Sequence, residues 1–215
     1  LKICIDIIML CLFLYLMYYH PGMGLRFHGI LGIALCALFA LHHFLNLKWY
    51  RVLFRGRYRF RRLLMTASDF LLLVAMLAIM LSSLMISGLA FPISFLPVAF
   101  YWRDMHVLST AWGFVLTAFH LGVHLHGFFT KIERKISRTI FGYAMYLPEL
   151  LILGGGIYGF LQSGLWGCMR MIPRNRQTLP ALLFYLEYMG MIGAMCIIVH
   201  YLIEAVQKLK VRKAV

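Results

Sequence analysis

Long apolar stretches alternate with short polar connections along the whole chain. Several of these stretches run for about twenty residues with few charges, and a helix of that length crosses the ~30 Å hydrocarbon core of a bilayer. The pattern predicts an all-α integral membrane protein, because a soluble domain has no need of such stretches. Six transmembrane helices are expected, at residues 3–19, 27–47, 66–90, 105–128, 141–162 and 181–205.

Lysine and arginine are distributed unevenly between the connections. Sixteen of the 21 lie at Lys2, in the connections 48–62 and 129–140, or in the C-terminal tail, and only five lie in the opposite connections. The positive-inside rule therefore predicts a multi-pass protein of the cytoplasmic membrane with both termini in the cytoplasm. The net charge of +14 is explained by this topology, so the chain is not expected to bind nucleic acid.

Two histidine pairs share the same spacing, fourteen residues from His28 to His42 and fourteen from His106 to His120. Fourteen helical residues turn through roughly 1400°, so both rings of a pair leave the same face, and they rise about 21 Å. The second and fourth predicted helices run parallel, because one helix separates them. His28 should therefore meet His106 near the outer surface, and His42 should meet His120 near the inner surface. Neutral imidazole is a normal iron ligand, so the pattern predicts two stacked b-type haems.

Other residues support this interpretation or offer alternatives to it. Gly32 and Gly113 could leave room for a porphyrin, and three basic residues near span ends could meet haem propionates: Arg26, Arg103 and Lys48. His43 and His124 are alternative ligands at the inner level. The five cysteines form no C-x-x-C and no C-x-x-C-H, which argues against c-type haem, cysteine-rich zinc sites and iron–sulfur clusters.

Three histidines have no matching partner in this scheme: His20, His126 and His200. His200 is interpreted as a structural histidine, with a quinone pocket as the alternative. Glu149 is the only acid near the middle of a predicted span, and it could carry protons for quinone chemistry or simply pair with a tyrosine or histidine.

Residues 154–159 match the G-x-G-x-x-G pattern of dinucleotide-binding sites. That pattern needs a preceding strand and a βαβ unit, and neither is predicted here. Small residues within an apolar span more often let two membrane helices approach closely. We therefore expect a helix–helix contact at this motif.

Two stretches are similar to a known family. The first runs from Phe27 to Gly32 and on to the H-H-x-x-N-x-x-W motif at 42–49. The second has Trp112-Gly113 separated from His120 by six residues and extends to His124. Together they resemble the flavinylation-associated cytochrome family of bacterial membrane proteins over residues 1–129. The resemblance implies a cytochrome b-like four-helix haem-binding bundle in that range, ligated by His28, His42, His106 and His120, with His43 and His124 as further family-like positions. Residues 130–215 would add two helices to the same membrane domain.

The expected function is electron transfer across the membrane, as a subunit of an oxidoreductase rather than a stand-alone enzyme. The donor would be a quinol or a cytoplasmic reductase, and the acceptor an extracytoplasmic protein such as a flavoprotein; a homodimer is compatible with this scheme. The alternatives are a transporter that uses histidines as metal or ion ligands, and a structural membrane subunit without a cofactor. Transporters tend to place polar sites at the midplane, whereas the paired histidines are predicted at two outer depths.

Overall fold

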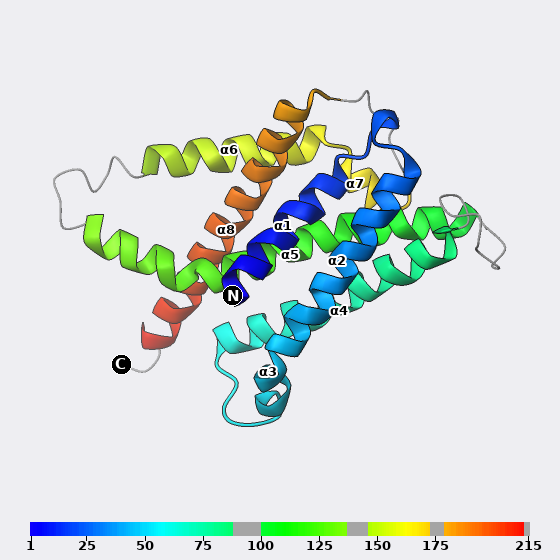
Figure 1. Cartoon of the computed structure of the whole chain (residues 1–215). Coiled ribbons are helices and arrows are strands. Elements are labelled where there is room, and N and C mark those ends of the chain that lie inside the picture. Colours follow the sequence, from blue (N-terminus) through cyan, green and yellow to red (C-terminus); the bar gives the residue numbers. More distant parts are fainter. Residues whose placement is uncertain (88–99, 137–145, 173–178, 213–215) are drawn as a thin grey trace.

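The computed structural model describes residues 1–87, 100–136, 146–172 and 179–212, and these parts of the chain are helical almost throughout, with no strand. Figure 1 shows long helices packed at various angles. The helices are α1 (Lys2–Met17), α2 (Leu25–Leu45), α3 (Leu47–Val52), α4 (Phe60–Met85), α5 (Phe100–Ile136), α6 (Tyr146–Gln162), α7 (Leu165–Cys168) and α8 (Ala181–Arg212), with a 3-10 turn at Pro21–Met23. The prediction of an all-α fold is confirmed for the described residues.

Four of the described helices, α2, α4, α5 and α8, are long and apolar enough to cross a membrane. Six were predicted, and the described helices do not support that number. Helix α1 has 16 residues and α6 has 17, so each rises roughly 25 Å, less than the ~30 Å hydrocarbon core. Apolar residues continue past the end of α1, but the helix itself ends at Met17. The predicted first part of the fifth span, 141–145, lies outside the described residues.

Two of the long helices extend beyond their predicted ends. Helix α5 continues from the predicted end at residue 128 to Ile136, and α4 begins at Phe60 instead of residue 66. The predicted spans end where charged residues begin, because they were drawn from hydropathy alone. The helices continue through these residues because Lys and Arg are good helix formers. The structure therefore carries helical, basic extensions at the ends of its apolar spans.

Helix α5 lies at the centre of the packing (Figure 1). It packs along α4 and along α8, while α6 packs on α8 and α1 packs on α2. One core cluster joins buried residues from both parts of the chain, such as Phe13 of α1, Phe114 of α5 and Tyr188 of α8. Helix α8 therefore contributes to the same core as α1 and α5.

The G-x-G-x-x-G motif lies in α6 and forms a close contact with α8. A Cβ atom added at Gly156 would overlap the backbone oxygen of Gly190 and the Cβ of Ala194, and one added at Gly159 would lie 3.3 Å from the backbone oxygen of Glu187. The two helix backbones approach this closely only because neither glycine has a side chain. The expectation of a helix–helix contact here is confirmed.

Replacing Gly156 with alanine should force α6 and α8 apart, and we expect it to destabilise the protein by about 1–3 kcal/mol, the usual cost of overpacking. Gly154 is the matched control, since a Cβ there meets nothing within 4 Å. Gly154→Ala should be neutral or slightly stabilising, because alanine favours the helix. Thermal unfolding of the two variants in detergent measures the difference, and equal midpoints would contradict the close contact.

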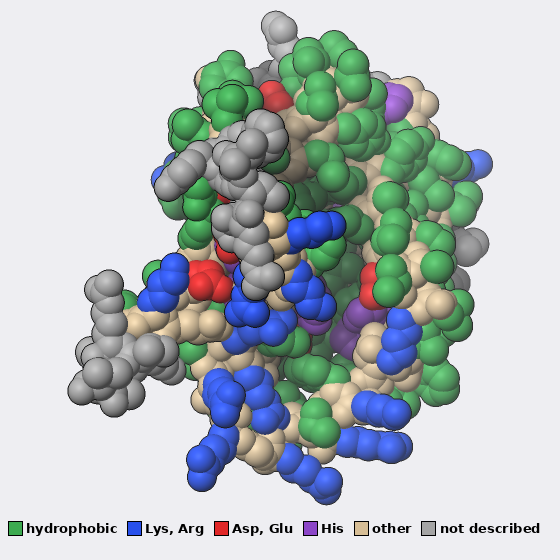
Figure 2. All heavy atoms as spheres, turned by 90° about the vertical axis from the view of Figure 1, so that its left-hand side faces the viewer, with side chains coloured by type: hydrophobic (Ala, Val, Ile, Leu, Met, Phe, Trp, Pro, Cys, Tyr) green, Lys and Arg blue, Asp and Glu red, His purple; other side chains and the backbone are tan. Residues whose placement is uncertain are grey.

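Basic side chains gather at one end of the molecule. In Figure 2 the lysine and arginine side chains concentrate in the lower half of the visible face, while hydrophobic side chains cover the upper part. The sequence places most of them in the segment around α3 and at the C-terminal ends of α5 and α8. We call this the basic end of the molecule.

Candidate functional site

His28 of α2 and His106 of α5 lie together, at the end of the molecule away from the basic end. Their ring centres are 6.2 Å apart and the ring planes are nearly perpendicular, at 80°. Tyr19 adds an edge contact to His28, with ring centres 5.3 Å apart. We call His28 and His106 the far-end pair; the spacing of the histidines predicted that these two rings would be neighbours.

Two serine hydroxyls of α4 lie beside Nδ1 of His106. Its Nδ1 lies 3.4 Å from Ser82 Oγ and 3.2 Å from Ser83 Oγ. Ser82 is buried, and its hydroxyl donates to the backbone oxygen of Ala78 at 2.7 Å. The Ser82 oxygen is therefore left as an acceptor for hydrogen on Nδ1, whereas the nearer Ser83 hydroxyl can either accept from Nδ1 or donate to it. Such a partner on the second nitrogen orients a metal-binding histidine.

Nδ1 of His28, unlike Nδ1 of His106, lacks a hydrogen-bond partner among the described residues. This atom is also shielded from solvent. Leaving a buried polar atom unpaired costs about 1–3 kcal/mol, so such atoms usually have a partner. A bound group or water at the far-end pair would therefore add an interaction that the described protein atoms do not provide.

Four further histidines lie near the basic end, and we call them the basic-end group: His42, His43, His120 and His124. His42 Nδ1 is 2.7 Å from an Asp6 carboxylate oxygen on α1, and His43 Nδ1 is 2.6 Å from the hydroxyl of Tyr50 on α3. A carboxylate only accepts hydrogen bonds, so His42 donates through Nδ1 and keeps a lone pair on Nε2.

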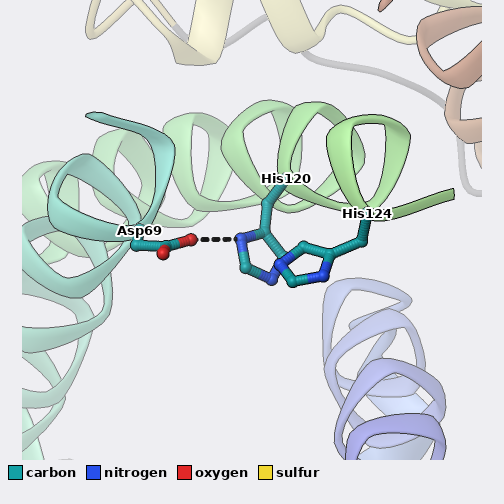
Figure 3. A group of neighbouring side chains, drawn as sticks. All are labelled: Asp69, His120 and His124. Carbon is teal, nitrogen blue, oxygen red and sulfur yellow. Dashed lines mark ion pairs between the residues drawn. The ribbon is translucent and has the colours of Figure 1, made fainter. Parts of the chain in front are cut away.

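His120 and His124 lie one turn apart on α5 and face a carboxylate on α4. His120 Nδ1 is 2.8 Å from an Asp69 oxygen, and the ring centres of His120 and His124 are 4.4 Å apart. Figure 3 shows all three side chains pointing into the same space. One donor atom from each residue lies within 4.8 Å of the others, a spacing that could hold a metal ion.

The basic-end histidines are not paired across α2 and α5 as predicted. The partners described for His42 are Asp6 and His43, and those for His120 are Asp69 and His124. In the part of the chain that the structure describes, no ring contact joins His42 to His120. The physical reason is that each ring turns toward a carboxylate on the helix beside it, α1 for His42 and α4 for His120.

The two glycines predicted to make room for a porphyrin differ from each other. A Cβ at Gly32 would meet nothing within 4 Å, whereas one at Gly113 would lie 3.1 Å from Ile79 Cδ1 and 3.6 Å from Phe13 Cζ. Ile79 and Phe13 therefore pack beside Gly113, whereas the side of Gly32 is open. The role of the two glycines beside a porphyrin stays a prediction. The three predicted propionate partners are all exposed: Arg26, Arg103 and Lys48.

A second polar cluster, in the α5–α8 interface, was missed by the sequence analysis. His126 and His200 are both buried and meet through their Nδ1 atoms at 3.0 Å. His200 Nε2 lies 3.0 Å from a Glu133 oxygen, and His126 Nε2 lies 4.0 Å from a Glu204 oxygen. The sequence held a signal, because His126 and Glu133 are seven residues apart on α5 while His200 and Glu204 are four apart on α8. Each pair therefore lies on one helix face.

Glu149 pairs with a tyrosine, which is one of the two alternatives left open by its position. The hydroxyl of Tyr201 on α8 donates to Glu149 Oε2 at 2.7 Å. The carboxylate thus joins α6 to α8 and belongs to the same interface as the glycine contact.

No family model matches the chain, and no curated protein or solved structure is significantly similar to it. The resemblance to flavinylation-associated cytochromes thus stays a prediction from residues 27–49 and 106–124. Functional conclusions rest on the arrangement of the histidines and their partners.

Proposed function

We propose that the protein is a b-type membrane cytochrome that carries electrons across the bilayer. The observation that carries the proposal is the orientation of three predicted ligands: His42, His106 and His120. Each has its Nδ1 beside an oxygen on a neighbouring helix, at 2.7–3.4 Å. The carboxylate of Asp6 keeps hydrogen on Nδ1 of His42 and leaves its lone pair on Nε2, the form in which a histidine binds metal. His106 and His120 in the same form would also present Nε2 to a metal.

The far-end pair supports one haem. His28 and His106 would hold it, because metal–nitrogen bonds to histidine are about 2 Å long and two rings that bind one metal must be close neighbours. The ring centres of His28 and His106 are 6.2 Å apart. The unpaired Nδ1 of His28 is also consistent with a bound group at this position.

The basic end would hold the second haem. Its ligands would come from His42 or His43 on α2 and from His120 or His124 on α5. His42 and His120 are preferred, because each has a carboxylate beside Nδ1 and would bind iron through Nε2. Exposed basic side chains would attract the propionates at both levels, with Lys48 near the basic-end group and Arg26 and Arg103 near the far-end pair. Gly32, one turn from His28, leaves open space near the far-end pair.

Haem with two histidine ligands has no open position for dioxygen, so when bound it would supply one-electron transfer and little other chemistry. The protein would act as the electron-transfer subunit of an oxidoreductase. Its donor would be a quinol or a cytoplasmic reductase, and its acceptor an extracytoplasmic protein such as a flavoprotein. This direction follows the resemblance to flavinylation-associated cytochromes.

The same proposal includes the finer membrane topology. The basic end would face the cytoplasm of a bacterium, with both termini on that side, because lysine and arginine are retained there. Helices α1 and α6 would count as the first and fifth of six spans, with residues 1–129 as the cytochrome b-like bundle and 130–215 as two added helices. Lys2 at the start of α1 can reach the interface and offset part of the short length of that helix.

A reduced-minus-oxidised absorption spectrum of the purified protein tests the proposal. We expect the narrow α band of low-spin haem and about two haems per chain by the pyridine haemochrome assay. His20→Ala is the control, since the ring contact described for His20 is with Tyr18 and not with a histidine of either group. A colourless protein that is pure, folded and supplied with haem would rule out the cytochrome.

A histidine-using metal transporter is the second candidate. The observation that favours it is the group of Asp69, His120 and His124, whose donor atoms lie within 4.8 Å of one another. A transport assay with Zn²⁺ in proteoliposomes separates the two functions, because a cytochrome would give no uptake above that of protein-free vesicles.

A further inference from the structure

Asp69, His120 and His124 combine the donor types of a small metal site. The two histidines are four residues apart on α5, which is the spacing that brings two imidazoles to one ion on a helix. Asp69 comes from α4 and provides a carboxylate, so the group spans two helices (Figure 3). None of these three residues belongs to the far-end pair.

The contact between Asp69 and His120 points to a missing partner. Asp69 Oδ1 and His120 Nδ1 lie 2.8 Å apart, yet both atoms are shielded from solvent and neither makes an aligned hydrogen bond. Two donors bound to one ion at about 2 Å each lie roughly 3 Å apart. The two atoms therefore have the spacing of neighbouring ligands, and an ion would satisfy both of them.

We propose that Asp69, His120 and His124 bind a divalent transition-metal ion of the zinc class, and that this ion and the basic-end haem exclude each other. The exclusion rests on the proposed cytochrome function, whereas the metal site does not. A neutral imidazole has a lone pair on only one nitrogen. His120 would use Nδ1 for an ion beside Asp69 and Nε2 for a haem, so it cannot serve both.

The ligand types determine the class of ion. Two imidazoles and one carboxylate suit Zn²⁺, Fe²⁺ or Co²⁺, whereas Ca²⁺ and Mg²⁺ prefer sites made of oxygen atoms. Zinc sites with three protein ligands keep a fourth position for water. His124 is exposed in the described structure, so the remaining positions of the ion would be open.

The first experiment titrates the haem-free full-length protein in detergent with Co²⁺, followed by its visible absorption bands, and then displaces Co²⁺ with Zn²⁺. We expect one ion per chain. Asp69→Asn and His124→Ala should each weaken binding by about tenfold or more. Asp104→Asn is the matched control: its carboxylate is exposed on α5 and lies outside the group, so its affinity should equal that of the wild type. Binding that is the same in all four proteins would overturn the metal site.

The second experiment adds haem to the protein with and without saturating Zn²⁺. We expect about one haem per chain with Zn²⁺ and two without it, and Asp69→Asn should remove this difference. Two haems in both conditions would overturn the exclusion. If no form of the protein bound haem, the cytochrome function and the exclusion would fail together, and the Co²⁺ titration would still decide the metal site.

Discussion

Replacing His106 with alanine is expected to reduce the haem content from about two per chain to about one. The far-end pair has no substitute ligand in the described structure, since the nearest polar partners of His106 are the hydroxyls of Ser82 and Ser83. Serine is a poor iron ligand compared with imidazole. A pyridine haemochrome assay on the purified variant measures the loss, and the remaining haem should keep a low-spin spectrum.

Substitutions of the two far-end histidines should have the same, non-additive effect on haem content. His28→Ala should give the same haem content as His106→Ala, and the double variant should lose nothing more, because either substitution already removes one of the two ligands. A single substitution in the basic-end group should cost less haem, since four histidines lie there. Full haem content in His106→Ala would contradict the assignment of the far-end pair.

Replacing His200 with leucine is expected to have the largest effect on stability, roughly 3 kcal/mol, the usual cost of breaking a buried polar or charged pair. The substitution leaves the buried Nδ1 of His126 without its 3.0 Å partner and leaves Glu133 without its contact to His200 Nε2. Thermal unfolding in detergent, or unfolding by a denaturing detergent, measures the change.

The coupling within this pair gives a sharper test. Replacing both His126 and His200 with leucine should cost less than the sum of the two single substitutions, because no buried imidazole is then left unpaired. Glu204→Gln is the control: its contact to His126 is 4.0 Å long, so we expect a loss of under about 1 kcal/mol. A His200→Leu variant as stable as the wild type would contradict a structural role for the pair.

Most of the long helices could be predicted from the sequence, because a single apolar segment of twenty residues satisfies all its backbone hydrogen bonds in a bilayer only as a helix. Helices α2, α4, α5 and α8 all contain their predicted spans, apart from a few residues at the ends and residues 88–90, which lie outside the described residues. Hydropathy was a poor guide to helix ends. The prediction placed the end of α1 beyond Met17 and the end of α5 before Ile136. Hydropathy indicates which residues are stable in lipid, but it does not indicate where the backbone hydrogen bonds of a helix end.

The candidate site was predictable in part. The spacing along α2 and α5 correctly placed His28 beside His106. It failed to foresee that His42 turns to Asp6 and His120 to Asp69, because those contacts depend on α1 and α4. It also missed the His126–His200 contact, since His200 lies 74 residues further along the chain than His126.

The sequence by itself determined the class of the protein, the approximate position of its long helices and which histidines share a helix face. These properties follow from local physics: the length of an apolar run and the 3.6-residue period of the helix. Only the tertiary structure decided which face meets which neighbour. The rotation and crossing of each helix depend on packing across the whole core, where Phe13 and Ile79 fill the space beside Gly113 and α8 packs along α5. The partners of His42 and His120 at the basic end depend in the same way on the placement of α1 and α4.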